Sequence, residues 1–219
     1  MKAIVIDHYA HPSKQPVTNQ ASEPKPAADE VLVEVHSACA IVHPSTSERS
    51  LIHMRLHSGA YAERVAAKWQ NLHPIPNGFS FEQAAGLFVT WPTSYEALVG
   101  RAQLQPGEWL HAAAGGVGLA AVQIAKALGA KVIATAGTQD KLKVCKTFGG
   151  ADEVLDYTKS GWQKEVLKLT NGKGVDVIYD PVGLIKDSLK CIAWKGRALV
   201  VGFAAGEIEK CRKNGIASS

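Results

Sequence analysis

A glycine-rich segment between an apolar stretch and a helix-like stretch limits most strongly what this chain can fold into. Residues 112–121 read AAAGGVGLAA. A dinucleotide-binding turn needs glycine where the backbone meets the pyrophosphate and where the helix packs on the strand, and Gly115 and Gly118 occupy these places. Ala113 stands where the first glycine of the pattern is expected. We predict a pyrophosphate-binding loop at a helix N-terminus; a glycine turn that only packs helix on sheet is the alternative.

Short apolar stretches alternate with helical stretches from Phe79 onward. This alternation is typical of right-handed βαβ crossovers. It predicts the fold class α/β, with a doubly wound parallel sheet of the Rossmann type over residues 79–209. The expected strands are Trp109–Ala114, Lys131–Ala136, Glu153–Tyr157, Val175–Tyr179 and Ala198–Phe203, and the expected helices between them are Val117–Leu128, Gln139–Phe148, Trp162–Leu169 and Leu184–Ile192. Ser80 is expected to cap an earlier helix.

The first 78 residues have a different pattern. Lys2–Ile6 and Glu30–Val35 resemble strands, the second with a period of two, and a weaker β pattern returns at Ala60–Val65. Residues 41–58 fit no regular element, and residues 210–219 form a polar tail. We therefore expect a β domain over 1–78, a dinucleotide-binding domain over 79–209 and a tail over 210–219.

Composition excludes several classes of protein. The net charge of +4, from 24 basic and 20 acidic residues, is too small and too evenly spread to indicate a nucleic-acid partner. No apolar stretch reaches the roughly 18 residues that a membrane-spanning helix needs. The four cysteines are Cys39, Cys145, Cys191 and Cys211. Their spacing does not match a redox or zinc motif, and scattered free cysteines favour a reducing compartment. We expect a cytoplasmic protein without membrane or nucleic-acid partners.

Four residues before position 60 have a spacing that resembles a zinc site. They are Cys39, His43, His53 and His57. A zinc finger needs a second cysteine close to the first, and this segment has none. We favour solvated histidines in an irregular loop and predict no metal.

The strand after the glycine loop distinguishes between two nicotinamide cofactors. A site for NAD has an acid about 20 residues past the loop, which binds the ribose 2′-hydroxyl. Residues 134–138 hold no acid, and Asp140 comes later, at the start of a helix. Lys141 follows and is suited to a 2′-phosphate, although it could equally lie on a solvated helix face. This pattern favours NADPH over NADH.

Six segments make the chain similar to the medium-chain dehydrogenase/reductase superfamily, and within it to the zinc-free quinone oxidoreductases. These segments are GAYAERV at 59–65, AAGLFVTWPTSYEAL at 84–98, HAAAGGVGLAAVQIAKALGAKVIATAGTQDK at 111–141, GADEVLDY at 150–157, VDVIYDPVG at 175–183 and ALVVGFAAGE at 198–207. The resemblance implies a GroES-like β domain, here partial, joined to a Rossmann domain. It also implies reduction of a quinone or an activated alkene such as an enone by NADPH, and it allows a homodimer.

The resemblance also assigns cofactor contacts to individual residues. Thr93 would approach the nicotinamide amide, and Gly202 and Phe203 would lie near the nicotinamide. The pyrophosphate would contact Gly115, Gly116, Val117 and Gly118, and the adenosine 2′-phosphate would lie among Gly137, Lys141 and Tyr157. The cofactor carries the hydride chemistry in such enzymes, so the resemblance implies no essential acid or base, and the catalytic side chains stay unknown.

Three departures from the family pattern leave a second hypothesis open. Residues 41–58 replace a longer stretch of the β domain, and the strand before the glycine loop has only Trp109 and Leu110 as large apolar residues ahead of His111. The family also continues past residue 209 into a further strand. We therefore interpret the chain as a truncated and internally deleted member. The alternative to a reductase is a non-catalytic remnant that at most binds nucleotide.

Overall fold

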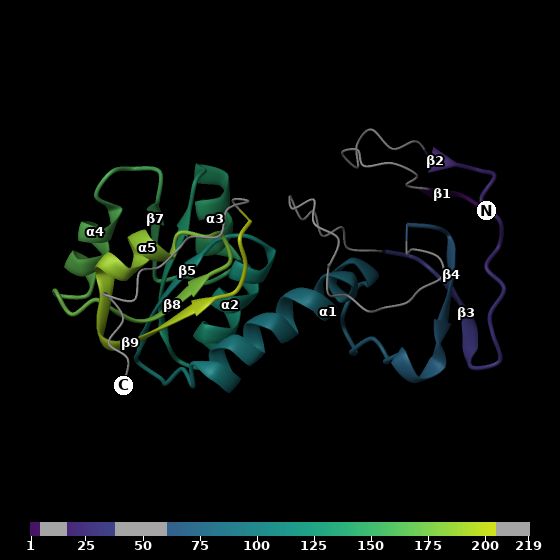
Figure 1. Cartoon of the computed structure of the whole chain (residues 1–219), viewed down its shortest axis with the longest axis horizontal. Coiled ribbons are helices and arrows are strands. Elements are labelled where there is room, and N and C mark those ends of the chain that lie inside the picture. The colour runs from purple at the N-terminus through teal and green to yellow at the C-terminus, as the bar shows by residue number, and fades with distance from the viewer. Residues whose placement is uncertain (5–16, 38–60, 205–219) are drawn as a thin grey trace. The chain divides into compact units, whose positions relative to one another are not determined.

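The computed structural model describes residues 1–4, 17–37 and 61–204, and these form two compact units (Figure 1). One unit holds the described residues up to 87 and the other begins at 88, so the division falls inside helix α1 (Phe81–Tyr95). Across these ranges, no helix has the length and apolar character needed to cross a bilayer. Segment 41–58 and the candidate zinc ligands Cys39, His43, His53 and His57 lie outside the described residues.

The N-terminal unit is built from short antiparallel pairs. Strand β1 (Ala3–Ile4) pairs with β2 (Val17–Thr18), and β3 (Glu30–Glu34) pairs with β4 (Arg64–Lys68), followed by the 3-10 turn η2 (Trp69–Asn71). The last strand runs to Lys68 rather than ending at residue 65 as expected, because each of its residues pairs with one of β3. Ser80 and Gln83 cap α1 reciprocally: each backbone N–H donates to the other's side-chain oxygen, at 2.9 and 3.2 Å.

The second unit contains a parallel sheet with the strand order β7-β6-β5-β8-β9, of which Figure 1 labels β7, β5, β8 and β9. The strands are β5 (Trp109–Ala113), β6 (Lys131–Ala136), β7 (Glu153–Asp156), β8 (Val175–Asp180) and β9 (Ile192–Val200). The helical elements are α2 (Gly116–Ala127), α3 (Gln139–Thr147), α4 (Trp162–Leu169) and α5 (Ile185–Ser188), with the π-helical segment η3 (Glu96–Arg101) and the 3-10 turn η4 (Leu189–Cys191). The chain winds outward from β5 in both directions, so the predicted doubly wound Rossmann sheet is confirmed.

Two apolar cores lie on the two faces of this sheet. One core contains Val122 and Ala125 of α2, and the other contains Trp162 and Val166 of α4. Alternate residues of the central strands contribute to opposite cores, as period-two side chains do; Ile133 and Val132 of β6 are an example. Both faces are therefore covered, which explains why the strands read as continuous apolar stretches.

The predicted helix over Leu184–Ile192 is α-helical only in its first half, continues as the 3-10 turn η4 to Cys191, and is wrong at Ile192. Helix α5 ends at Ser188, and β9 begins at Ile192, six residues before the expected start of the strand. Val175 pairs with Ile192 but Val177 pairs with Arg197, so β9 carries extra residues in a bulge. Within the bulge Lys195 takes a left-handed conformation, with φ at 61°.

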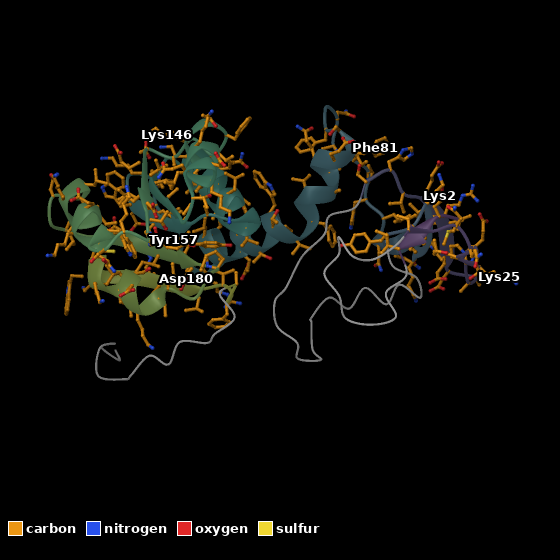
Figure 2. All side chains as sticks on the ribbon, turned by 90° about the horizontal axis from the view of Figure 1, so that it is seen from above. Lys2, Lys25, Phe81, Lys146, Tyr157 and Asp180 are labelled. Carbon is orange, nitrogen blue, oxygen red and sulfur yellow. The ribbon has the colours of Figure 1, made fainter. Side chains whose placement is uncertain are left out.

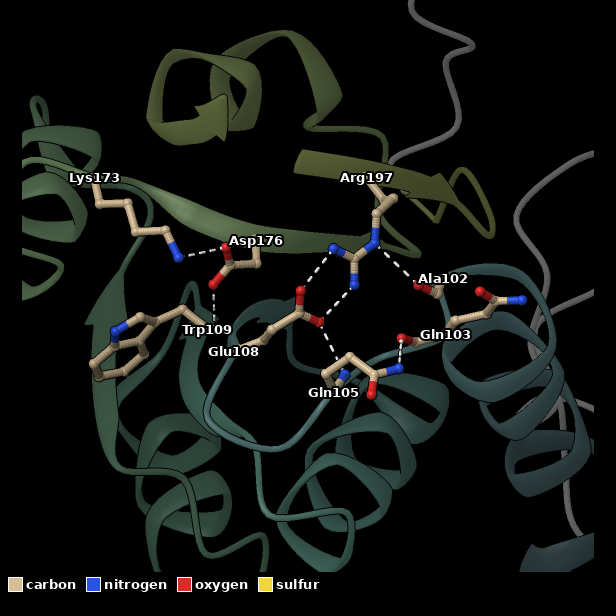
Figure 3. A network of polar contacts seen from close by, with 8 residues as sticks. All are labelled: Ala102, Gln103, Gln105, Glu108, Trp109, Lys173, Asp176 and Arg197. Atoms are coloured by element: carbon tan, nitrogen blue, oxygen red, sulfur yellow. Dashed lines mark hydrogen bonds and ion pairs between the residues drawn. The ribbon is translucent and has the colours of Figure 1, made fainter. Parts of the chain in front are cut away.

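A polar network holds the beginning of β5 (Figure 3). The guanidinium of Arg197, on β9, donates to both carboxylate oxygens of Glu108 at 2.8 and 2.6 Å and to the carbonyl of Ala102 at 3.0 Å. The Asp176 carboxylate, on β8, accepts a hydrogen bond from the backbone of Trp109 at 2.9 Å. The hydrogen bond from Arg197 lowers the pKa of Glu108, which therefore stays ionised at neutral pH. Bidentate pairing of this kind restricts the orientation of both side chains. The network therefore anchors the amino-terminal end of β5, which is the end opposite the glycine loop.

A histidine lies buried in the middle of β5. His111 is 2% exposed, and its ring stacks on Trp162 with the centroids 5.1 Å apart. Its Nε2 is 3.1 Å from the Thr135 hydroxyl, whereas Nδ1 has no hydrogen-bond partner among the described residues. Burial lowers the pKa of His111 to about 4, so the imidazole is neutral in the folded protein at neutral pH.

We expect His111 to make the sheet unit sensitive to acid. The folded pKa lies below the unfolded value of about 6.5, so the unfolded chain takes up the proton first and stability is lost as pH falls from 6.5 towards 4. Between about pH 7 and about pH 4.5 this histidine should account for about 2 kcal/mol of the lost unfolding free energy. Urea unfolding at the two pH values measures it.

The comparison variant is His111→Leu. Between the two pH values its unfolding free energy should fall by about 2 kcal/mol less than that of the unchanged protein. Gln70→Leu, at an exposed position without a titratable group, provides the control for an added leucine. An equal pH dependence for His111→Leu and the unchanged protein would contradict the assignment.

Candidate cofactor site

The glycine loop joins the end of β5 to the start of α2. The Ala114 N–H donates to the Thr135 carbonyl of β6 at 2.6 Å, so the chain follows the sheet up to the loop. The first helical bond runs from the Leu119 N–H to the Gly115 carbonyl at 2.8 Å, and no side chain caps this N-terminus. The N–H groups of a first helical turn have no acceptor within their helix. The loop therefore presents backbone donors and a positive dipole end, which suit a phosphate.

Gly118 sits where the helix touches the strand. A Cβ atom built on Gly118 would lie 1.9 Å from the carbonyl oxygen of Ala113, so no other residue fits without moving α2 away from β5. A Cβ on Gly115 would meet nothing within 4 Å, and its backbone is extended. A Cβ on Gly116 would lie 3.4 Å from a methyl carbon of Thr90. The glycines thus differ: Gly118 serves packing, while Gly115 faces open space where a ligand can approach.

Helix α1 is fastened to this loop by a buried hydroxyl pair that the sequence analysis missed. The Ser94 hydroxyl donates to the carbonyl of Val117 at 2.8 Å and lies 2.8 Å from the Tyr179 hydroxyl. Because Ser94 has one proton to donate, Tyr179 is the donor in the second bond. Both side chains are fully buried, and burial raises the pKa of Tyr179, which therefore stays protonated. Thr93, the expected nicotinamide contact, is half-buried on the same helix, beside Ser94.

A second group of residues lies at the tip of β6. A Cβ on Gly137 would lie 3.2 Å from the Tyr157 hydroxyl, so this pair is in direct contact; Tyr157 is labelled in Figure 2. Thr138 caps α3 by accepting a hydrogen bond from the backbone of Lys141 at 3.4 Å, and the Lys141 side chain is exposed. Gly137 and Tyr157 therefore lie together at one strand end, with Lys141 in the first turn of the helix that follows, and residues 134–138 at the tip of β6 hold no acid.

The remaining expected contacts follow β9. The N–H groups of Val201 and Gly202 donate to the carbonyl of Asp180 at 2.8 and 3.3 Å, which brings Gly202 and the half-buried Phe203 beside the end of β8. The buried Asp180 carboxylate, labelled in Figure 2, accepts three backbone N–H groups of residues 182–184. Asp180 therefore closes a turn with its carboxylate.

The expected site residues therefore share one edge of the sheet. The loop follows β5, Gly137 follows β6, Tyr157 follows β7, and Gly202 lies beside the end of β8. In a parallel sheet these carboxyl ends lie together, and open α/β sheets bind ligands there. Among residues 1–4, 17–37 and 61–204, no group of three metal-ligating side chains is found.

Comparison with known proteins identifies related chains. The family described as zinc-binding dehydrogenase matches residues 116–217. A quinone oxidoreductase-like protein 2 homolog from Nematostella vectensis is 42% identical over 161 residues, which are 71% of this chain and 44% of that protein. The chain thus spans less than half the length of this curated relative.

Solved structures with the same fold match nearly the whole chain. A probable oxidoreductase from Mycobacterium abscessus has a TM-score of 0.78 and 33% identity, over 92% of this chain and 74% of that chain. The quinone oxidoreductase of Thermus thermophilus, solved alone and in complex with NADPH, has a TM-score of 0.76 and 28% identity, over 95% and 75% of the two chains.

We expect Gly118→Ala to destabilise the protein, because the new methyl group would overlap the Ala113 carbonyl. Overpacking of this kind costs about 1–3 kcal/mol or more. Gly115→Ala is the matched control in the same loop, and it should leave the unfolding free energy within about 0.5 kcal/mol of the original. Urea unfolding measures both variants, and equal stability for the two would refute the packing role of Gly118.

We expect Ser94→Ala and Tyr179→Phe each to lower the unfolding free energy by about 1–3 kcal/mol, because each leaves a buried partner without its hydrogen bond. The double variant should lose less than the sum of the two, by roughly 1 kcal/mol. A double-mutant cycle from urea unfolding measures this coupling. Strictly additive losses would show that the two hydroxyls do not act as a pair.

Proposed function

Because this chain belongs to the medium-chain dehydrogenase/reductase superfamily, in its quinone oxidoreductase group, we propose that it binds NADPH and reduces a quinone or an activated alkene without zinc. The observation that carries the proposal is the arrangement of the sheet edge. An uncapped helix N-terminus follows β5, and a tip without an acid follows β6, with Lys141 in the next helical turn. The first suits a pyrophosphate and the second suits a 2′-phosphate.

In this proposal the protein binds and orients, while NADPH supplies the hydride. Backbone N–H groups from Gly115 to Gly118 hold the pyrophosphate. Tyr157 and Lys141 donate to the 2′-phosphate beside Gly137, which has no side chain to occupy that space. Thr93 holds the nicotinamide amide, with Gly202 and Phe203 near the ring. Holding the reactants in the right geometry is itself a large share of catalysis, so no side chain is assigned as acid or base.

The proposal also includes a reaction without zinc, a class of substrate, and the oligomeric state and compartment of the protein. The zinc-dependent members of the superfamily use a Gly-His-Glu ligand motif, and this sequence does not contain it. A small apolar acceptor such as a quinone or an enone is the proposed substrate, and a homodimer in the cytoplasm is the proposed state. The competing function is nucleotide binding without turnover. The two functions differ in whether bound NADPH is consumed when a quinone is added.

We expect the protein to bind NADPH about tenfold or more tightly than NADH, since a charged hydrogen bond to the 2′-phosphate contributes about 1.5–3 kcal/mol. Energy transfer from tryptophan to the reduced nicotinamide measures both affinities. Lys141→Ala should weaken NADPH binding by about tenfold and leave NADH unchanged. Lys143→Ala, an exposed lysine on the same helix, is the control and should change neither.

The outcomes separate the hypotheses. NADPH binding followed by its oxidation with a quinone supports the reductase, whereas binding without oxidation supports the nucleotide-binding remnant. Equal affinity for NADPH and NADH would overturn the assignment of the 2′-phosphate site. Absence of binding to either cofactor would overturn the proposed function as a whole.

A further inference from the structure

We propose that Asp156 is a positioning residue for cofactor selectivity, which holds Tyr157 and Thr158 against Gly137 so that the site recognises a 2′-phosphate. This inference rests on the proposed function, because it concerns how NADPH would be distinguished from NADH. Asp156 would act through its neighbours and need not touch the cofactor.

Asp156 is the last residue of β7 and organises the turn that follows. Its Oδ1 accepts the backbone N–H of Thr158 at 2.9 Å and the Thr158 hydroxyl at 2.6 Å. Its backbone carbonyl accepts the Lys159 N–H at 3.3 Å. The Tyr157 N–H donates to the carbonyl of Ala136, the residue that pairs with Asp156 across the sheet, also at 3.3 Å. The turn is thus tied both to its own carboxylate and to the end of β6.

This turn places two side chains on one side of Gly137. A Cβ on Gly137 would lie 3.2 Å from the Tyr157 hydroxyl and 3.4 Å from the Thr158 methyl carbon. Those distances mean that Tyr157 and Thr158 already flank the glycine, with a phenolic hydroxyl at the strand tip. A phenol is a good donor to phosphate, but only if its orientation is held. NADH has no 2′-phosphate, so loss of that orientation should affect NADPH alone.

The carboxylate of Asp156 has a structural role in this arrangement. The hydrogen bonds from Thr158 lower the pKa of Asp156, so the group is ionised at neutral pH, with Oδ1 engaged by its own turn. A carboxylate that instead bound a ribose 2′-hydroxyl would favour NADH, and its negative charge would repel a 2′-phosphate. The two roles predict opposite effects when the charge is removed and the hydrogen bonds are kept.

Three variants separate these roles. Asp156→Ala removes the acceptor, and we expect NADPH affinity to fall about tenfold while NADH affinity stays within about twofold. Asp156→Asn keeps an acceptor oxygen without the charge and should preserve the NADPH-to-NADH ratio within about twofold. Thr158→Val keeps a methyl group against Gly137 but loses the hydroxyl, so its loss should be smaller, about threefold. Thr147→Val, which removes an exposed hydroxyl bonded within α3, is the matched control.

Affinities are measured by tryptophan energy transfer to NADPH and NADH. Adenosine 2′,5′-bisphosphate and adenosine 5′-monophosphate, which differ only in the 2′-phosphate, serve as a second pair of probes by calorimetry. A selective loss for the 2′-phosphorylated probes in Asp156→Ala, with recovery in Asp156→Asn, supports the inference. An equal loss for all probes shows a merely structural role and overturns it, and tighter NADPH binding by Asp156→Asn overturns it in favour of charge repulsion.

The proposed function and this inference fail in different ways. If the unchanged protein binds NADPH selectively but Asp156→Ala keeps the same selectivity, only the inference fails. If the unchanged protein binds neither cofactor, the proposed function fails and the inference fails with it. Thermal unfolding of each variant establishes that a change in affinity does not come from an unfolded sheet unit.

Discussion

The backbone approach of α2 to β5 is the constraint on which the candidate site depends. Gly118 lets the first turn of the helix lie against the carbonyl of Ala113, where any side chain would overlap. This contact aims the helix N-terminus along the carboxyl edge of the sheet, where its N–H groups are available to a ligand. The short apolar stretch ahead of the loop does not disturb it, because all five residues of β5 pair with β6.

Polar groups hold β5 along its length, in three different environments. At its amino-terminal end, Arg197 and Glu108 form a bidentate pair. In its middle, His111 is desolvated and stacked on Trp162, so it stays neutral at a cost in stability at acid pH. Beyond its end, Ser94 ties α1 to the first turn of α2. Buried polar groups are expensive unless paired, and these pairs restrict the strand and its loop to one position.

The candidate site has two corners, one at the end of β5 and one at the end of β6, and different chemical groups line them. The corner at β5 relies on backbone N–H groups and a helix dipole, which any pyrophosphate would satisfy. The corner at β6 relies on side chains held in place by a neighbouring turn, with Gly137 leaving space and Asp156 fixing the turn. Under the proposed function the first corner would supply most of the affinity and the second would distinguish NADPH from NADH. Under that proposal, selectivity for NADPH would depend on shape and positioning as much as on charge.

Local pattern by itself determined the class of fold and the position of the loop. The alternation of apolar and helical stretches indicated a parallel sheet, and the spacing of Gly115 and Gly118 located the glycine turn between β5 and α2, because each of these signals is carried by residues that are near one another in sequence. Only the tertiary structure decided the features that depend on contacts between residues far apart in sequence. Ser94 and Tyr179 are 85 residues apart in sequence, and neither residue type signals the other. The early start of β9 at Ile192 arises from a bulge against β8, and the role proposed for Asp156 rests on how its turn places Tyr157 and Thr158 beside Gly137. Periodicity reports which face of a segment is buried, whereas the partner that covers that face is chosen only when the chain folds.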